Sequence, residues 1–212
     1  MPPNLNEEKK LWKKGYKVVA CLDEVGRGCL AGPVMAAAVC TNLKFASPRL
    51  NFKFAQRIKD SKKLTPQKRE EFYKILTKHP AIKWGLGRIS EKVIDRINIL
   101  EATKLAMEKA VKNLKLKINY LILDGNIKIN SSVPQKSIVK GDEKVFSCAA
   151  ASIIAKVMRD RLMEKYAKKF PEYGFDRHKG YGTSQHRKAL KKHGPCKIHR
   201  KSFRPVNTCK LK

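Results

Sequence analysis

Short apolar runs of strand length alternate along this chain with longer segments whose apolar residues recur at helical spacing. Strands are predicted for KVVACLD, VMAAAVCTNL, AIKWGLGRI and NYLILDGN, with a further brief strand and turn in SIVKGDEKV. Only a short link containing glycine and proline separates the first two runs, so we expect them to form an antiparallel hairpin. Strands and helices in this order indicate an α/β domain with a central mixed β-sheet flanked by helices.

Helix ends are indicated by capping residues. Thr65 and Pro66 suit the N-cap and first position of one helix, and Ser90 could cap a second helix that runs through EKVIDRINILEATKLAMEKAVKNL. Four apolar residues of this second helix fall near one face: Ile97, Leu100, Leu105 and Ala106. A long helix is predicted from about residue 146, and a short one from about Thr183 to Gly194.

The length of 212 residues suits one sizeable domain, and a hydrophobic content of 42% argues against a disordered chain. We expect a single domain over residues 17–206, which includes a small C-terminal helical, substrate-binding part from about residue 161 to residue 206. A basic polar leader, residues 1–16, precedes this domain, and a tail, residues 207–212, follows it.

The balance of charge is strongly positive. The chain has 48 Lys and Arg against 18 Asp and Glu, which gives a net charge of +30. Residues 161–212 alone carry 16 Lys and Arg against 3 Asp and Glu, a net charge of +13. Lysines that merely solvate helix faces account for part of this excess, but solvation would be served equally well by mixed signs. The charge therefore predicts a polyanionic partner, and nucleic acid fits best.

The cysteines indicate the compartment. Six cysteines lie scattered, mostly inside apolar runs, and none shows a paired CxxC spacing. They are typical of small buried residues in a reducing cytosol, so we expect a cytoplasmic protein. No apolar stretch approaches the length of about 18 residues that a membrane span requires. We therefore expect no membrane association, and we expect the chain to act as a monomer.

Four acidic residues stand where predicted strands end or in the turn beyond them. They are Asp23 and Glu24 after the first strand, Asp124 after the NYLIL run, and Asp142 in the KGD turn before the long helix. Strand ends and the loops beyond them are where sites gather in α/β sheets. Clustered carboxylates repel one another unless a cation neutralises them, and oxygen ligands favour Mg²⁺ or Mn²⁺. Singly, an Asp beside Gly is more often a cap or turn residue, but the set in a basic chain favours metal-assisted phosphoryl chemistry.

Such chemistry uses two ions, one that activates a water and one that stabilises the departing oxygen. Neighbouring side chains on a strand point to opposite faces, so we expect the strand to end at Asp23 and Glu24 to turn toward the same metals. Asp160 lies 18 residues beyond Asp142. A helix over most of that interval separates the two by about 20 Å, so Asp160 is predicted to pair with a nearby cation instead.

Eight motifs occur in consistent order between about residue 17 and about residue 206. They are DEVGRG with LAGPV, DSKKLT, NILEAT, LDGN, KGD, AAASIIAKVMRD, HKGYGT and HGPCKIHRKSFRPV. Together they resemble bacterial ribonuclease HII, the type 2 ribonuclease H. The resemblance implies a ribonuclease H-like fold and metal-dependent cleavage of the RNA strand in RNA/DNA hybrids. It also implies cuts on the 5′ side of single ribonucleotides in duplex DNA, with 3′-hydroxyl and 5′-phosphate products.

The resemblance also assigns residues. The four catalytic, metal-binding carboxylates of the family fall on Asp23, Glu24, Asp124 and Asp142. The loop that reads the RNA–DNA junction falls on Gly26, Arg27 and Gly28, its aromatic partner on Tyr181, and a phosphate-side loop on Ser61, Lys62 and Lys63. Glycines let the backbone approach a sugar, and an arginine can fork onto a phosphate. Without the resemblance, Tyr181 is more simply a packing residue, and the DSKK residues are equally a solvated turn.

Other classes stay open. A non-catalytic basic nucleic-acid-binding protein would explain the charge but has no need of the four carboxylates. A zinc module would use residues crowded near the C-terminus, although they lack paired-ligand spacing: His186, His193, Cys196, His199 and Cys209. The type 3 ribonuclease H carries a substantial N-terminal domain that a leader of 16 residues does not supply. The archaeal and eukaryotic type 2 enzymes are further relatives, but HGPCKIHRKSFRPV is closer to the bacterial form.

Overall fold

The computed structural model describes residues 2–41, 58 and 64–209. Its helices are α1 (Asn6–Lys13), α2 (Pro66–Lys78), α3 (Glu91–Asn113), α4 (Gly141–Lys144), α5 (Phe146–Lys169), α6 (Phe175–His178) and α7 (Ser184–His193). Its strands are β1 (Val19–Val25), β2 (Val34–Thr41), β3 (Ile82–Ile89), β4 (Tyr120–Asp124) and β5 (Gln135–Ile138). None of the helices within these ranges is long and apolar enough to cross a membrane.

The strands form one mixed sheet in the order β3-β2-β1-β4-β5. β1 and β2 form the expected antiparallel hairpin, and β3 pairs antiparallel with β2. β4 and β5 run parallel to β1, so the carboxyl ends of these three strands meet at one edge of the sheet. The predicted mixed sheet is thus confirmed, and its parallel half is the part that can gather side chains into a site.

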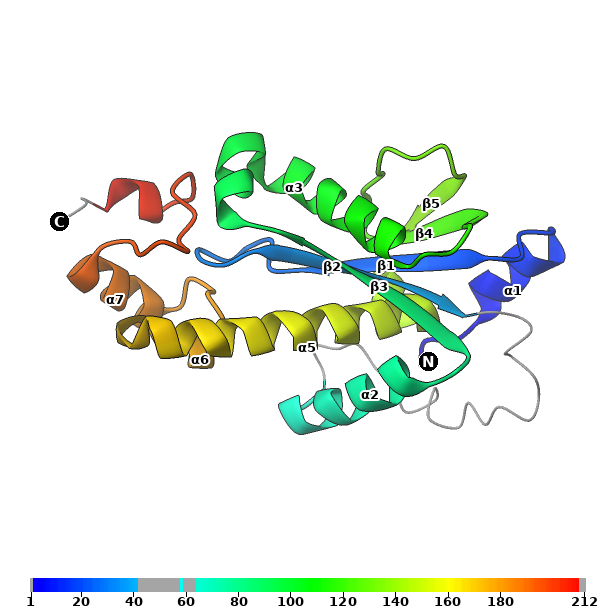
Figure 1. Ribbon diagram of the computed structural model, residues 1–212, viewed down its shortest axis with the longest axis horizontal. Helices are drawn as coiled ribbons and strands as arrows, with labels where there is room; N and C mark the ends of the chain where they lie inside the picture. Colours follow the sequence, from blue (N-terminus) through cyan, green and yellow to red (C-terminus); the bar gives the residue numbers. More distant parts are fainter. Residues whose placement is uncertain (1, 42–57, 59–63, 210–212) are drawn as a thin grey trace.

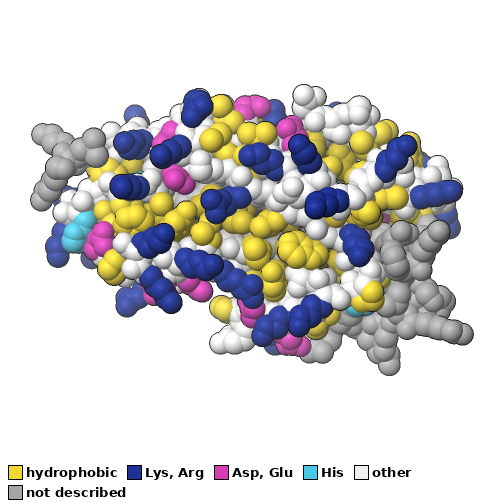
Figure 2. Space-filling model, viewed as in Figure 1, with side chains coloured by type: hydrophobic (Ala, Val, Ile, Leu, Met, Phe, Trp, Pro, Cys, Tyr) yellow, Lys and Arg dark blue, Asp and Glu magenta, His cyan; other side chains and the backbone are white. Residues whose placement is uncertain are grey.

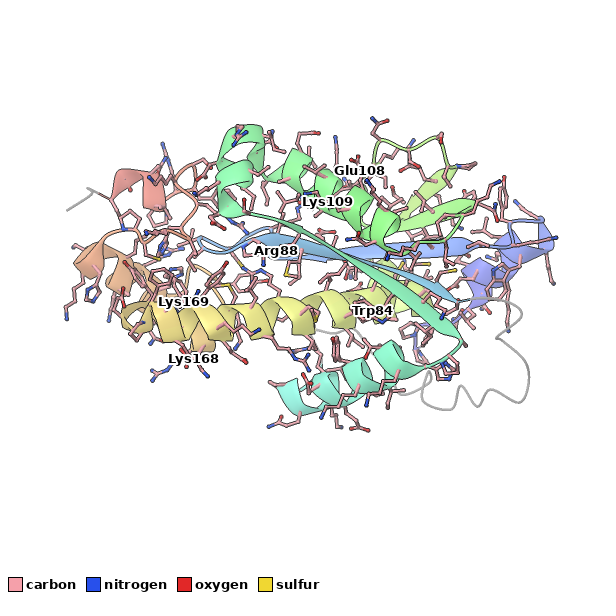
Figure 3. The ribbon with its side chains drawn as sticks, viewed as in Figure 1. Trp84, Arg88, Glu108, Lys109, Lys168 and Lys169 are labelled. Carbon is pink, nitrogen blue, oxygen red and sulfur yellow. The ribbon has the colours of Figure 1, made fainter. Side chains whose placement is uncertain are left out.

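Helices cover both faces of the sheet (Figure 1). α3 packs on one face, and α5 with α2 packs on the other. Gly85 and Gly87 allow the close approach of α3, because a Cβ atom at these positions would lie 2.3 Å from the Ala110 oxygen and 1.9 Å from the Ala106 oxygen. On the α5 side, Trp84 extends from β3 toward the helices (Figure 3), and its indole N–H donates to the carbonyl of Thr77 in α2 at 3.4 Å.

The helix α3 is kinked, which the apolar spacing did not predict. Asn98 has a φ of 65° inside the helix, and its side-chain oxygen accepts the N–H groups of Leu100 and Glu101 at 2.9 and 3.1 Å. Asn98 therefore acts as a cap within the helix, and the spacing of the residues that face the sheet is interrupted at the kink. As a result, the expected stripe through Leu100 and Ala106 is wrong: Ala106 is buried, whereas Leu100 is 41% exposed.

The leader contains a helix that belongs to the core. In α1, Leu11 and Trp12 are buried against β1 and the start of α5. Glu8 is fully buried, and one of its carboxylate oxygens accepts the N–H of Ser147 at 3.2 Å, in the first turn of α5. Its other oxygen has no hydrogen-bond partner within the described residues. Burial raises the pKa of Glu8 to about 7, because the ionised carboxylate loses its hydration.

This raised pKa predicts how stability depends on pH. The folded pKa of Glu8 lies above the ordinary value of 4.5, so the folded chain binds the proton more tightly than the unfolded chain. The free energy of unfolding should fall as the pH rises from about 4.5 to about 7. Glu8→Gln should remove this fall and raise the free energy of unfolding at pH 8 by about 3 kcal/mol. Urea unfolding at pH 5 and pH 8 measures both, and an unchanged pH slope in the variant contradicts the prediction.

The C-terminal region packs on the far end of α5, away from α1 (Figure 1). Thr183 is the N-cap of α7, and its hydroxyl accepts the N–H of His186 at 3.3 Å. The helix ends at His193, before Gly194, so its predicted boundaries are confirmed. Backbone hydrogen bonds tie this region to the loop after β1: Gly32 N–H donates to the Ile198 oxygen at 2.8 Å, and Arg200 N–H donates to the Leu30 oxygen at 2.9 Å.

Candidate active site

Three of the predicted carboxylates come together at the carboxyl edge of the parallel strands. Asp23 lies in β1, Asp124 ends β4, and Asp142 lies in α4. One carboxylate oxygen from each lies within 4.8 Å of the others. Asp23 and Asp142 are buried, each 4% exposed, whereas Asp124 is partly open to solvent. We call this group the carboxylate triad.

Strand register and a glycine turn position the triad. β1 and β4 pair Leu22 with Leu123, so Asp23 and Asp124 both follow the last paired residue of two adjacent parallel strands. One oxygen of Asp124 accepts the N–H groups of Gly125 at 2.8 Å and Gly141 at 2.6 Å. A Cβ atom on Gly141 would lie 3.3 Å from that oxygen. The absence of a side chain there lets the turn that carries the third acid approach β4.

The electrostatics of the triad suit a bound cation. Burial raises the pKa of Asp23 well above its ordinary value, and the negative charges of Glu24 and Asp124 raise it further. A hydrogen bond with Ser152 of α5 acts in the opposite direction. Clustered, desolvated carboxylates are unfavourable without a compensating positive charge. Because every donor in the triad is a carboxylate oxygen, the set fits a hard divalent cation.

Glu24 is not one of the three residues whose carboxylate oxygens lie within 4.8 Å of one another. β1 runs on to Val25, so the expectation that the strand ends at Asp23 is wrong. Adjacent strand residues point to opposite faces, and Glu24 instead pairs with Arg27, whose guanidinium lies 3.3 Å from its carboxylate. Burial raises the pKa of Glu24, the positive charge of Arg27 lowers it, and the charge of Asp124 raises it. The pKa of Glu24 therefore still depends on the negative charge of the triad.

Asp160 pairs with cations, as predicted. One of its oxygens lies 2.8 Å from the ammonium of Lys156, one helical turn earlier in α5, and the other lies 3.6 Å from the guanidinium of Arg69 in α2. The pair with Arg69 joins α2 to α5, whereas the pair with Lys156 lies within α5. Asp160 is not a member of the triad.

Tyr181 lies directly against the loop that follows β1. It forms an isolated antiparallel bridge with Cys29, and the N–H of Leu30 donates to the oxygen of Gly180 at 2.8 Å. The Tyr181 side chain is 39% exposed, with the Lys156 ammonium 5.8 Å and the Arg159 guanidinium 6.0 Å from its ring centre. The loop before Cys29 is Gly26–Gly28. The structure thus brings together the two segments that the resemblance assigned to reading the substrate.

Two buried arginines hold these segments, and the sequence analysis missed both. Arg159 donates to the carbonyl oxygens of Pro33, Lys179 and Ala31 at 3.0, 2.8 and 3.1 Å. Arg200 donates to those of Gly32, Arg27 and Gly26 at 3.0, 2.8 and 2.6 Å. Both are fully buried, and no ion pair of either is found among the described residues. Neither has a clear sequence signal, because Arg159 stands among several other charged residues of α5 and Arg200 is one of the basic residues in the HRKSF motif.

Gly26 is required by the packing of Arg159. It has a φ of 93°, and a Cβ atom there would lie 2.2 Å from the Nε atom of Arg159. The glycine that precedes Arg27 is therefore fixed by its neighbour as well as by its backbone angle. The other predicted substrate residues, Ser61, Lys62 and Lys63, lie outside the described residues.

Three of the five residues weighed as zinc ligands, His186, Cys196 and His199, are used in hydrogen bonds. The Nε2 atoms of His186 and His199 lie 3.0 Å apart, and the Cys196 sulfur lies 3.1 Å from Nδ1 of His199. Within the described part of the chain, the group of His, Cys, Asp and Glu side chains that could hold an ion is the carboxylate triad.

A family model described as Ribonuclease HII matches residues 20–206. The chain belongs to the ribonuclease HII family. A ribonuclease HII of Bacillus mycoides is 51% identical over 199 residues, which cover 94% of this chain and 74% of the relative. A ribonuclease HII of Alkaliphilus oremlandii is 44% identical over 207 residues, covering 95% of this chain and 97% of the relative. The chain is thus a type 2 ribonuclease H, an endoribonuclease.

Solved structures agree with the ribonuclease HII assignment. The ribonuclease H2 of Pyrococcus horikoshii superposes with a TM-score of 0.73 at 26% identity, over 91% of this chain and 96% of that one. The ribonuclease HII in a PCNA complex from Archaeoglobus fulgidus gives a TM-score of 0.72 at 27% identity, over 88% and 95% of the two chains. A Bst-RNase HIII, at 16% identity and a TM-score of 0.64 over 92% and 69%, shares the fold. The predicted ribonuclease H-like fold is confirmed.

Proposed function

We propose that this ribonuclease HII hydrolyses the RNA strand of RNA/DNA hybrids and cuts on the 5′ side of single ribonucleotides in duplex DNA. The products are a 3′-hydroxyl and a 5′-phosphate. One observation carries the proposal: the strand that bears Asp23 continues directly into the Gly26–Gly28 loop, and Tyr181 pairs with Cys29 immediately after that loop. The groups proposed to hold a metal and those proposed to contact a sugar are therefore joined by one strand and the loop that follows it.

The metal site of this proposal consists of Asp23, Asp124 and Asp142, with Glu24 as a fourth carboxylate that the family resemblance assigns. Mg²⁺ or Mn²⁺ suits these oxygen donors. When bound, a pair of such ions supplies an activated water and stabilises the departing oxygen. The chain itself orients the donors: the glycine N–H groups fix Asp124, and Ser152 holds Asp23 by a hydrogen bond.

Discrimination between RNA and DNA at one position requires contact with the 2′-hydroxyl. We assign this contact to the backbone of the Gly26–Gly28 loop, where small residues let amides and carbonyls reach the sugar. Arg27, whose side chain is 43% exposed, is assigned to a phosphate. The Tyr181 ring packs on the deoxyribose that follows the ribonucleotide.

Duplex binding is supported by the charge of the surface. Figure 2 shows Lys and Arg side chains distributed over the described part of the visible face, with fewer Asp and Glu and with hydrophobic side chains between them. A groove at the start of α7 is lined by Gly182, Ser184, Arg187, Lys188 and Lys191, with no acidic residue among them. Cations at a helix N-terminus suit phosphate oxygens. Ser61, Lys62 and Lys63 are proposed as a further phosphate contact on the resemblance alone, and we propose a cytoplasmic monomer.

The decisive experiment uses a DNA duplex that contains one ribonucleotide. With Mg²⁺ or Mn²⁺, the protein should cut on its 5′ side and leave a 3′-hydroxyl, and chelation of the metal should stop cleavage while binding persists. An all-DNA duplex of the same sequence is the control. Cutting without any metal would contradict the proposed metal site, and binding without any cutting would favour a non-catalytic nucleic-acid-binding protein instead.

Tyr181→Ala should lower the single-turnover rate of cleavage at a single ribonucleotide by about 10-fold or more, because the sugar loses the surface that aligns it. Tyr181→Phe keeps the ring and should stay within about 3-fold of the wild type. Thermal unfolding of both variants should match the wild type, since the side chain is partly exposed. Equal rates for the Ala and Phe variants would remove Tyr181 from the substrate site.

A further inference from the structure

Three buried histidines lie beneath the segment that presents Tyr181. His178 ends α6, His186 lies in the first turn of α7, and His199 follows α7 in the chain. They are 8%, 0% and 2% exposed. The rings of His178 and His186 stack with centres 4.4 Å apart and planes 12° apart. The proposed reaction does not use any of them. His178 and His186 bond to the backbone of this segment, and His199 bonds to His186.

A chain of hydrogen bonds links His199 to Tyr181 and fixes the proton on each ring. The carbonyl oxygen of Tyr181 lies 2.9 Å from Nδ1 of His186, and since a carbonyl only accepts, this Nδ1 carries the proton. At the other end, the N–H of Cys196 donates to Nδ1 of His199 at 2.9 Å, so that nitrogen carries none. The 3.0 Å contact between the two Nε2 atoms is then a bond donated by His199 to His186.

The relay is complete only when both rings are neutral. A proton added to Nε2 of His186 would point at the N–H of His199, and a proton added to Nδ1 of His199 would point at the N–H of Cys196. Burial lowers the pKa of each ring to about 4, so both are neutral at neutral pH.

His178 holds the same segment from below. Its Nδ1 accepts the N–H of Gly180 at 3.2 Å, and its Nε2 donates to the carbonyl oxygen of Tyr173 at 2.7 Å. This orientation is also that of a neutral ring. Imidazoles thus hold the backbone on both sides of the Gly180–Tyr181 bond. Gly180 also packs closely against the loop after β1, because a Cβ atom on it would lie 2.5 Å from the Ala31 oxygen.

We propose that His186 and His199 are positioning residues of this ribonuclease HII, which hold the Tyr181 backbone through the Cys196–His199–His186 hydrogen-bond relay and so set the place of its ring beside Gly26–Gly28. The inference rests on the proposed role of Tyr181 at the substrate. If these histidines only filled space, another ring of similar shape would preserve the cleavage rate. If they position Tyr181, the rate depends on the hydrogen-bond donor at Nδ1 of His186, and this difference is testable.

Two variants of His186 separate packing from positioning. His186→Phe keeps a ring and removes the donor, whereas His186→Asn removes the ring and keeps an N–H close to the position of Nδ1. We expect His186→Phe to lower single-turnover cleavage at a single ribonucleotide by about 10-fold, because small misplacements of an aligning group are costly to rate. His186→Asn should recover most of this loss. A rate for the Phe variant that equals or exceeds that of the Asn variant overturns the relay.

A double variant shows whether the effect passes through Tyr181. In a Tyr181→Ala background, His186→Phe should change the rate by less than about 2-fold, because the group that it positions is gone. Full additivity of the two changes overturns the inference while leaving the role of Tyr181 intact. A Tyr181→Ala variant with the wild-type rate overturns the proposed role of Tyr181 and the relay with it.

A measurement on the unmodified chain tests the relay without catalysis. At pH 7, ¹⁵N NMR of the histidine rings should show His186 neutral with its proton on Nδ1 and His199 neutral with its proton on Nε2. Either ring in the other tautomer, or charged, overturns the relay whether or not the variants fold. The NMR result also stands if the wild-type chain fails to cut, so failure of the proposed function and failure of the relay are distinguished.

Discussion

Asp124→Asn is expected to lower single-turnover cleavage by at least about 1,000-fold, which corresponds to about 4 kcal/mol in activation free energy. Asparagine keeps the oxygen that accepts the Gly125 and Gly141 N–H groups, so the turn can keep its shape. What it removes is a negative charge from the triad, and a divalent cation is held chiefly by that charge. Cleavage of the single-ribonucleotide duplex in Mg²⁺ measures the loss.

The control for this change lies in the same protein. Asp160→Asn also removes a carboxylate, but one that pairs with Lys156 and Arg69 outside the triad, and its rate should stay within about 2-fold of the wild type. In metal-free buffer, Asp124→Asn should be at least as stable as the wild type, because it relieves the repulsion that raises the pKa of Asp23. Equal losses of rate in the two variants would contradict the assignment of the triad.

Arg200→Met should lower the free energy of unfolding by about 4 kcal/mol. The side chain is fully buried and donates to the carbonyl oxygens of Gly26, Arg27 and Gly32. Charge-assisted hydrogen bonds contribute about 1.5–3 kcal/mol each, and their removal leaves the buried oxygens without a donor. Arg200→Lys should recover little, because an ammonium cannot match the fork of a guanidinium. Urea unfolding measures the difference.

Arg27→Met is the matched control for Arg200→Met. The same change of side chain is made in the loop that Arg200 holds. The Arg27 side chain is 43% exposed, and among the described residues its ion pair is with Glu24, so the loss should be less than about 1 kcal/mol. If the two variants lose equal stability, the loop is not held from beneath by Arg200.

The sequence predicted the features that depend on neighbours along the chain. The hairpin of β1 and β2, the long helix α5 and the caps at Thr65 and Thr183 all follow from local spacing and composition, and the structure confirms them. Asp23, Asp124 and Asp142 were predicted to share a site because each stands at a predicted strand end or in the turn beyond it, and the structure brings them together. Their proximity is a property of topology, which alternating strands and helices already encode.

What the sequence did not predict depends on contacts between distant segments. The length of β1 is fixed by pairing with β2 up to Met35, and two further residues of strand place Glu24 on the opposite face from Asp23. The kink at Asn98 needs a side-chain cap that no periodicity shows. Arg159 and Arg200 appear in sequence as two more cations in a very basic chain, and only the fold reveals that their partners are carbonyl oxygens.

The clamp made by Arg200 joins residues that are 174 positions apart, since its guanidinium binds the oxygen of Gly26. During synthesis, β1 and the loop after it leave the ribosome long before their partner exists. A chain that has reached residue 170 already holds every acid of the triad but lacks Tyr181, the histidine relay and the arginine that shapes the loop. The residues proposed to hold the metal are therefore all synthesised before Tyr181, the relay histidines and Arg200, on which the proposed contact with the sugar depends.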